Sequence, residues 1–156
     1  GAPTSIAAKN FKQLGMTIPM YQSHGVASKK YIELSGAGAA EGVRLPAASL
    51  VVADHLPDSD PQKPIVVAYK KAYEKKWGSA VSTFGGHAYD GLMIAVQAIE
   101  RAGSTDKAAV LDEIEKTANF IGVDGIYSMS ASDHLGLNMD SFVMVEVSNG
   151  GWKLLK

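Results

Sequence analysis

The chain has 156 residues, of which 46% are hydrophobic and 20% charged, a composition typical of a folded domain with a hydrophobic core. Fifteen basic and sixteen acidic residues give a net charge of -1. The chain therefore lacks the concentrated positive charge that nucleic-acid binding requires, and we expect no nucleic-acid partner. The absence of cysteine excludes disulfide scaffolds, zinc–thiolate sites and cysteine nucleophiles.

The first sixty residues predict alternating helices and strands. A helix capped by Thr4 or Ser5 ends at Gly15, whose backbone can adopt the left-handed conformation that stops a helix. We then expect, in order, a buried strand over residues 16–21, a helix over 28–34 and a strand over 41–45. The proline-rich residues 46–61 predict a crossover with a short extended piece at 49–53.

The middle of the chain predicts three helices. Asp60 before Pro61 predicts a helix start, because the carboxylate can cap the first turn and proline's missing N–H is harmless there. The expected buried stripe of this helix is Ile65, Val66, Tyr69, Tyr73 and Trp77. Another helix covers 86–102, and we expect it to bury Leu92, Met93, Val96 and Ile99. A third follows a cap at Ser104 or Thr105.

The last part of the chain changes to strand character. Residues 125–129, 141–147 and 152–155 predict strands, with Asn149-Gly150 as a hairpin turn before the last one. Together with the earlier alternation, this predicts an α/β fold with a parallel sheet covered by helices. Three or four strands are too few for five helices, so we expect sheet partners that this chain does not contain.

Signals for catalysis, metal or cofactor are weak. Residues 36–42 are glycine-rich but follow a helix, whereas a dinucleotide loop must follow a strand. His87 with Asp90, and Asp133 with His134, could form a general base or part of a metal site, but no third ligand stands at helical spacing. Asp133 better fits a turn cap. We expect no catalytic residues, no metal site, no cofactor and no enzyme activity.

Two loops stand out for ligand binding. His24, flanked by Ser23 and Gly25, follows a predicted strand at the position where open α/β sheets bind ligands. A solvated loop histidine explains the same pattern. Phe84 precedes Gly85-Gly86, which would let backbone approach a ligand, although core packing of the ring also fits.

Several runs resemble the leucine/isoleucine/valine-binding family of periplasmic solute receptors. They are residues 12–16 (KQLGM), 21–27 (YQSHGVA), 40–43 (AEGV), 83–90 (TFGGHAYD) and the closing Gly122-x-x-Gly125, Asp133-His134 and Gly136 segment. Their order and spacing persist over nearly the whole chain, which resembles the C-terminal half of such a receptor.

The resemblance implies the type I periplasmic binding fold, in which two three-layer α/β lobes with parallel sheets enclose a ligand. Residues 1–45 and 139–156 would belong to one lobe and residues 46–138 to the other. Crossovers would lie near 46–60 and 130–140. The fold would be incomplete in this chain, and a preceding half or a partner chain would complete the sheets.

The resemblance also implies a ligand site at Ala2, Pro3, Ser23, His24, Gly25 and Phe84. His24 stands where amino-acid-binding members carry an acidic residue that pairs with the ligand's ammonium. An imidazole cannot supply that negative charge, so the expected ligand is a small amino acid or a related carboxylate or amide, aromatic ones included. Phe84 matches an aromatic ring that packs on the ligand, and Ala2 and Pro3 match a loop beside the cleft.

The function implied by the resemblance is that of a periplasmic or extracellular receptor that delivers its ligand to an ABC permease in the membrane. A regulatory sensor of the same fold is the alternative. Residues 1–5 show no signal-peptide pattern, so we expect that any such signal lies outside this chain.

Overall fold

The structure is a computed structural model that describes residues 2–155, without the side chain of residue 37. Its α-helices are α1 (Ala2–Gln13), α2 (Lys29–Ser35), α3 (Ala37–Ala40), α4 (Lys63–Trp77), α5 (Thr83–Ala102) and α6 (Lys107–Glu115). Short 3-10 helices are η1 (His24–Val26), η2 (Ser49–His55) and η3 (Met139–Ser141). The strands are β1 (Arg44–Ala47), β2 (Phe120–Ile121), β3 (Ile126–Tyr127), β4 (Val143–Ser148) and β5 (Gly151–Leu154).

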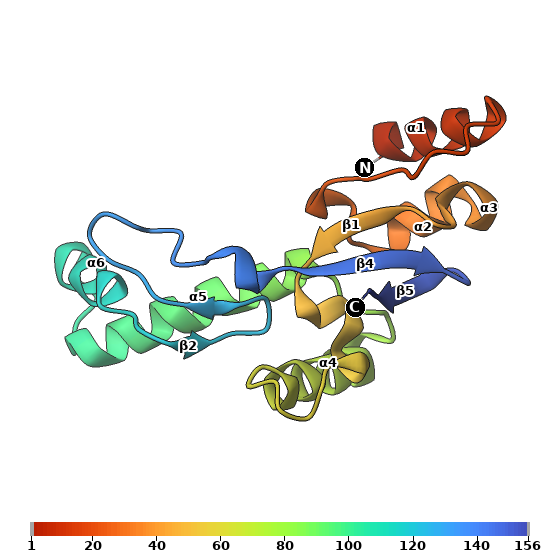
Figure 1. Cartoon of the computed structure of the whole chain (residues 1–156). Coiled ribbons are helices and arrows are strands. Elements are labelled where there is room, and N and C mark those ends of the chain that lie inside the picture. The colour runs from red at the N-terminus through yellow and green to blue at the C-terminus, as the bar shows by residue number, and fades with distance from the viewer. Residues whose placement is uncertain (1, 156) are drawn as a thin grey trace.

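The molecule is elongated, with a small sheet at one end and a helical extension at the other (Figure 1). Strands β1, β4 and β5 lie beside α1, α2 and α3, whereas α5, α6 and the β2–β3 hairpin extend away from them. We call residues 2–47 with 143–155 the sheet region, and residues 49–141 the helical region. The chain enters the helical region after β1 and returns from it before β4.

Local signals place most helix ends close to where the sequence predicts them. Ser28 caps α2, and Gly78 and Gly103 end α4 and α5 in left-handed conformations. Asp106, rather than Ser104 or Thr105, caps α6 with its carboxylate. Helix α4 begins at Lys63, after a turn in which the Asp60 carboxylate accepts the Gln62 N–H at 2.8 Å.

The strand pairing differs from the expected parallel sheet. Both ladders of the three-stranded sheet are antiparallel, and Asn149 and Gly150 adopt positive φ angles of 53° and 72° in the tight turn between β4 and β5. Such a two-residue turn can only join antiparallel strands. The sole parallel pairing among residues 2–155 is an isolated bridge between Tyr21 and Arg44.

Two predicted extended segments are therefore shorter or absent. Residues 16–21 form no strand beyond the bridge at Tyr21, and residues 49–53 are 3-10 helix instead of extended chain. The N–H of Arg44 donates to the Met20 carbonyl at 3.0 Å, and the Arg44 carbonyl accepts the Gln22 N–H at 2.8 Å. These two bonds have the slanted pattern of a parallel ladder that finds no continuation within residues 2–155.

The buried residues form two hydrophobic clusters. The first lies in the sheet region and includes Leu45, Val145 and Val147, each 0% exposed. The second lies in the helical region and includes Val66 and Val123; its other members are Leu50, Ala53 and Leu56. Helix η2 joins the clusters, because its Val52 packs in the first and Leu50 in the second. The predicted division into two lobes remains a prediction.

The helices bury other faces than the sequence predicts. In α5 the buried positions are Thr83, Gly86, Asp90, Ile94 and Ala98, whereas Leu92, Val96 and Ile99 are exposed and Met93 is half-buried. In α4 only Val66 is fully buried, and Trp77 is 62% exposed. Large apolar side chains on one helix face normally cover a core. The structure of residues 2–155 contains no element that covers these faces.

Leu45 is the side chain on which the sheet-region cluster can be tested. Replacing it with alanine leaves a cavity in this cluster and should lower the free energy of unfolding by about 2–5 kcal/mol in urea denaturation. Leu14→Ala is the control, because Leu14 is 76% exposed and its truncation should change stability by less than about 0.5 kcal/mol. Equal losses in both variants would contradict the assigned core.

Candidate functional site

The loop that carries His24 is fixed to the edge of the sheet. The bonds of Arg44 to Met20 and Gln22 hold the chain just before His24. The Ala27 N–H then donates to the His24 carbonyl at 3.0 Å and closes η1. The imidazole is exposed, and its ring centre lies 5.7 Å from that of Phe142 at an interplanar angle of 50°. His24 is thus presented by a tight backbone turn and contacts an aromatic ring.

Phe84 lies in the first turn of α5. The Ser82 hydroxyl accepts the Gly85 N–H at 3.4 Å and caps the helix at this point. The ring is 58% exposed, so the core-packing interpretation of Phe84 does not hold within residues 2–155. An exposed aromatic ring at a helix start is available to pack against a ligand, which remains a prediction.

His87 lies one helical turn after Phe84 in α5. Its Nδ1 lies 3.2 Å from Asp124 Oδ2, and its side chain is 45% exposed. Burial lowers the pKa of His87, the nearby Asp90 opposes this shift, and the charge of His24 adds to it. The charge of His24 in η1 thus acts on His87 in α5, and we call the surroundings of His24, Phe142 and His87 the junction.

The other predicted site residues contribute less to this junction. Ser23 is exposed, and Ser23 Oγ would lie 3.5 Å from a Cβ placed on Gly25, so the two positions adjoin. Ala2 and Pro3 are exposed at the start of α1. No hydrogen bond or ring contact described for residues 2–155 joins Ala2 or Pro3 to His24, and their role remains a prediction.

Two buried carboxyl groups join the end of the β2–β3 hairpin to α5. Asp90 accepts hydrogen bonds from the N–H groups of Val123 and Asp124, both at 2.8 Å, and from the Tyr127 hydroxyl at 3.2 Å. Asp90 is 0% exposed and Asp124 is 1% exposed. Asp90 is therefore occupied by structural bonds, in keeping with the weak signal that the His87–Asp90 spacing gave for catalysis or metal binding.

Glycines make room for both carboxyl groups. A Cβ on Gly86 would lie 2.4 Å from Asp124 Oδ2, and a Cβ on Gly122 would lie 2.5 Å from Asp90 Oδ2. Either distance is far inside normal van der Waals contact. Gly86 and Gly122 thus let α5 and the hairpin loop approach closely enough to enclose the carboxyl groups.

Both carboxyl groups have raised pKa values. Burial raises the pKa of Asp90, and its three hydrogen-bond donors oppose this shift. Burial and the negative charge of Asp90 raise the pKa of Asp124 to about 8, against a backbone hydrogen bond from His87. Asp124 therefore holds a proton at neutral pH, beside the imidazole of His87.

The second histidine–carboxylate pair is separated by its contacts. Asp133 Oδ1 accepts the N–H groups of Leu135 and Gly136, both at 3.0 Å, and so caps a turn as predicted. His134 Nε2 instead lies 2.9 Å from Glu115 Oε1. Within residues 2–155 no group of three or more histidine and acidic side chains could hold a metal ion.

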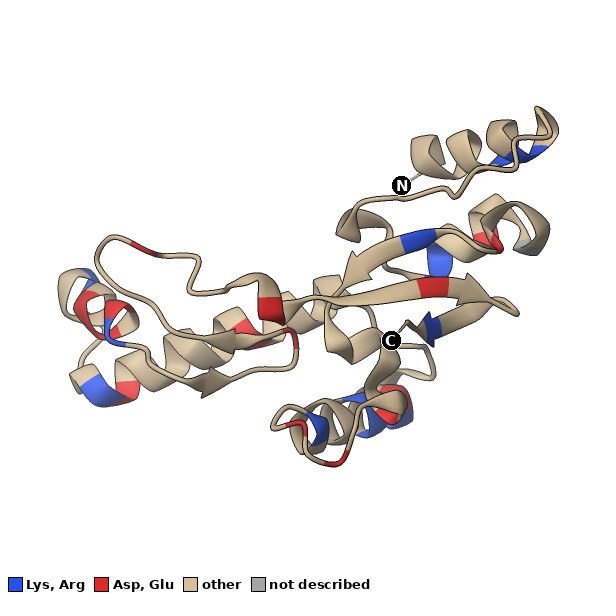
Figure 2. Ribbon diagram, viewed as in Figure 1, with Lys and Arg blue, Asp and Glu red and all other residues tan. Residues whose placement is uncertain are grey.

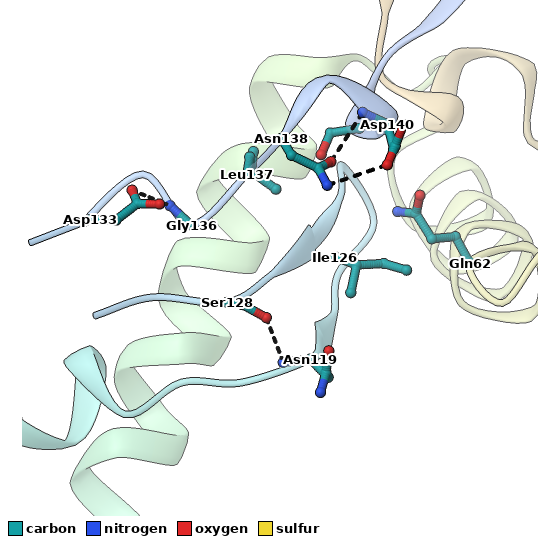
Figure 3. A pocket seen from close by; sticks show the side chains of 10 residues that line it. Gln62, Asn119, Ile126, Ser128, Asp133, Gly136, Leu137, Asn138 and Asp140 are labelled. Atoms are coloured by element: carbon teal, nitrogen blue, oxygen red, sulfur yellow. Dashed lines mark hydrogen bonds between the residues drawn. The ribbon is translucent and has the colours of Figure 1, made fainter.

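A polar pocket of about 370 Å³ lies in the helical region, beside the hairpin and the returning chain (Figure 3). Its polar side chains already serve local structure. Besides the Asp133 turn, Asn138 Oδ1 accepts the Asp140 N–H at 3.0 Å, and Gln62 Nε2 donates to the Gly122 carbonyl at 3.0 Å. The pocket therefore offers few free groups for recognising a ligand, unlike the junction at His24 and His87.

The charged side chains are dispersed over the structure (Figure 2). The lysines of α4 lie beside the acidic residues of the preceding segment, with Lys63 Nζ 2.7 Å from Asp58 Oδ1 and Lys70 paired with Asp54. The densest basic stretch of the sequence is thus partly neutralised in place. Within residues 2–155 no helix is both long and apolar enough to cross a bilayer.

Comparison with protein families matches residues 1–151 to the family described as "Periplasmic binding protein". The chain belongs to the periplasmic binding protein family. This confirms the family predicted from the sequence and indicates a binding protein, not an enzyme. No curated protein sequence matches the chain at a significant level.

Solved receptors share the fold. An extracellular ligand-binding receptor from Rhodopseudomonas palustris HaA2 superposes with a TM-score of 0.91 at 26% identity, over 100% of this chain and 46% of that receptor. A leucine-binding protein from Thermotoga maritima superposes with a TM-score of 0.81 at 26% identity, over 99% of this chain and 41% of that protein. An isoleucine-bound substrate-binding protein of a branched-chain amino acid transporter from Streptococcus pneumoniae superposes with a TM-score of 0.79 at 21% identity, over 99% of this chain and 42% of that protein. At this identity the similarity supports the fold alone.

The chain spans less than half the length of these receptors. The predicted fold class, incomplete lobes of a type I periplasmic binding protein, is confirmed. The partial coverage also gives a physical reason for the exposed apolar faces of α4 and α5, because a larger receptor contains further elements that can cover them. The sequence carried no signal for Phe142 or Asp124, and the carboxylate nearest His87 is Asp124 and not Asp90, which stands three residues after it.

Gly86 provides a test of the close approach between α5 and Asp124. Alanine normally stabilises a helix relative to glycine, but the added Cβ at this position would collide with the buried carboxyl group. Gly86→Ala should lower the free energy of unfolding by about 1–3 kcal/mol. The matched control is Gly91→Ala in the same helix, where a Cβ meets nothing within 4 Å and should raise stability by about 0.5–1 kcal/mol. If both variants were stabilised, the close approach would be wrong.

Asp124 should make stability depend on pH. Its folded-state pKa of about 8 lies above the ordinary value of 3.8, so the folded protein holds this proton more tightly than the unfolded chain. The contribution of Asp124 is fully present below pH 3.8 and is lost as pH rises through about 8. Asparagine does not ionise, so Asp124→Asn removes this loss. From pH 5 to pH 8, the free energy of unfolding of Asp124→Asn should rise relative to that of wild type by at least about 1 kcal/mol. Urea denaturation at several pH values measures this difference, and the exposed Asp140→Asn should show none.

Proposed function

We propose that the chain forms part of a receptor that binds a small carboxylate or amide-containing ligand, with an apolar or aromatic body, at the junction of His24, Phe84 and Phe142. The observation that carries this proposal is the surroundings of His24. Its ring lies 5.7 Å from that of Phe142, and its charge acts on a second imidazole, that of His87. These groups can donate hydrogen bonds and pack on a ring, but they offer no negative charge to a ligand ammonium.

The proposed ligand follows from this chemistry. A carboxylate or carbonyl accepts hydrogen bonds, and an imidazole N–H can donate one, more strongly when the imidazole is protonated. Exposed Phe84 and half-exposed Phe142 provide apolar surface for the rest of the ligand. Ser23 and Gly25, which adjoin His24, and Ala2 and Pro3 at the start of α1 complete the proposed site.

The proposed architecture is that of a two-lobed receptor. Residues 1–45 and 139–156 form part of one lobe and residues 46–138 part of the other, with the crossovers near 46–60 and 130–140. The two hydrophobic clusters and the exposed faces of α4 and α5 support this division. The elements that cover these faces and continue the parallel pairing at Arg44 would come from a preceding half of the protein or from a partner chain.

The proposed biological role is ligand delivery to an ABC permease of the branched-chain amino acid type, in the periplasm or outside the cell. Family membership and the similarity to a leucine-binding protein support this role. Ligand contacts from both lobes would favour the closed receptor, which is the form that a permease can distinguish from the open one.

Calorimetry on the full-length receptor tests the ligand class. We expect benzoate, phenylacetate or isovalerate to bind more tightly than leucine or valine, because the proposed site residues of this chain include no acidic partner for their ammonium group. His24→Ala should weaken carboxylate binding by about 10- to 100-fold, the effect of losing a hydrogen bond to a charged group. His134→Ala is the matched control, because His134 pairs with Glu115 away from the junction. Tight leucine binding that survives His24→Ala would overturn the proposal.

A further inference from the structure

We propose that Asp124 fixes His87 with its Nε2–H as a hydrogen-bond donor to the ligand, which makes His87 a second recognition residue in addition to His24. The proposal rests on the proposed function, since it names a further contact of the same site. Asp124 acts through His87 and is a positioning residue.

The imidazole of His87 lies with one nitrogen beside Asp124. Nδ1 is 3.2 Å from the buried Oδ2 of Asp124, and 45% of the His87 side chain is nevertheless exposed. Nδ1 is thus the nitrogen next to the buried carboxyl group, and we assign Nε2 to the exposed part of the side chain, where a ligand can reach it.

The polar contacts of the Asp124 carboxyl group are with His87. The backbone N–H of Asp124 is anchored by Asp90 at 2.8 Å, whereas the buried carboxyl oxygens meet Nδ1 of His87 at 3.2 Å and a backbone hydrogen bond from His87 that opposes the rise of the Asp124 pKa. Both oxygens are packed against Gly86, where a Cβ would lie within 2.7 Å of each. A buried polar group without a partner is costly, so a carboxyl group in this place needs a reason. Holding the imidazole provides one.

The location of the proton shared by Asp124 and His87 determines whether Nε2 of His87 carries hydrogen. If the proton is on Asp124, the carboxyl O–H donates to Nδ1 and the hydrogen of the neutral imidazole is on Nε2. If the proton moves to the imidazole, both nitrogens carry hydrogen. In both arrangements Nε2 is a donor. Only loss of the shared proton leaves Nδ1–H bound to a charged Asp124 and turns Nε2 into an acceptor.

The groups around Asp124 and His87 determine the pH at which the shared proton is lost. The ionisable groups that act on Asp124 or His87 come from four elements and are Asp90 of α5, Tyr127 of β3, Tyr69 of α4 and His24 of η1. Burial and the charge of Asp90 raise the pKa of Asp124 to about 8, whereas burial and His24 lower the pKa of His87. The shared proton is therefore held through neutral pH and is lost above about pH 8.

The consequence is selectivity for ligands that accept hydrogen bonds. Two imidazoles from segments more than sixty residues apart in sequence would donate to one carboxylate or carbonyl group. An ammonium group at the same place would meet two donors and no acceptor. Above about pH 8 the Nε2 lone pair would face the ligand's oxygen, and carboxylate affinity should fall by up to tenfold per pH unit because one proton must be taken up on binding.

The imidazole itself can be observed without any ligand. In nitrogen-15 NMR spectra of the full-length receptor, His87 should show hydrogen on Nε2 at pH 7 and a change of state above about pH 8. Asp124→Ala should remove this preference. A neutral His87 with hydrogen on Nδ1 at pH 7 would overturn the proposal whether or not the ligand class is right.

Binding measurements separate His87 from His24. With benzoate as the probe, His87→Ala should weaken binding about tenfold at pH 7, and His87→Gln, whose amide N–H can replace the Nε2–H, should recover part of that loss. Asp124→Asn should abolish the alkaline fall in affinity, because its amide can donate to Nδ1 at every pH. The exposed Asp140→Asn should retain that fall.

The outcomes distinguish this inference from the function on which it rests. If His24→Ala weakens benzoate binding and His87→Ala does not, the role of His87 is wrong and the ligand class stands. If benzoate and the other carboxylates fail to bind wild type while His87 shows the Nε2–H form, the ligand class is wrong and the positioning by Asp124 stands. An alkaline fall that persists unchanged in Asp124→Asn would overturn the coupling between the two residues.

Discussion

The pairing of β1 with β4 is the constraint on which the rest of the structure depends. It joins residues about one hundred positions apart, from Arg44 opposite Glu146 to Ala47 opposite Val143, and the Arg44 Nε–Glu146 Oε2 contact of 2.8 Å lies in the same ladder. Closing so long a loop costs entropy that grows only slowly with its length, and the buried cluster around Leu45 offsets it. The same ladder fixes the site: Arg44 binds the chain two residues before His24, and Phe142 directly precedes β4.

Orientation of the site within the helical region depends on two glycines and two carboxyl groups. Gly122 and Gly86 allow the hairpin loop to lie on α5, and Asp90 fastens that loop through two backbone N–H groups. This arrangement places Asp124 beneath His87. Under the proposed function, stability and recognition are coupled here, because the contact proposed to orient the imidazole also buries a carboxyl group whose ionisation the fold opposes.

Local features of the sequence predicted the structure better than its long-range features. The Asn149-Gly150 turn and the ends of α4 and α5 at Gly78 and Gly103 depend on neighbouring residues alone, and they lie where expected. Periodicity failed for α5, because both the stripe through Leu92 and the stripe through Asp90 recur at helical spacing. Packing against other elements of the structure decides which of two such faces is buried. At the proposed site, His24 and Phe84 were selected from their loops and stay predictions, whereas nothing in the sequence brings Asp124 to His87 across more than thirty residues.

The position of the two imidazoles relative to the two hydrophobic clusters bears on how a ligand could act. His24 belongs to the turn that buries Val26 and Ala27 in the sheet-region cluster, whereas His87 is fastened to Asp124, next to Val123 of the other cluster. A ligand that contacts only one imidazole binds without favouring any arrangement of the two regions. A single acceptor group shared by both stabilises the arrangement in which they approach, and only such a differential contact can shift a conformational equilibrium. Under the proposed function, the feature that selects a carboxylate over an ammonium is thus also the feature that would close the receptor.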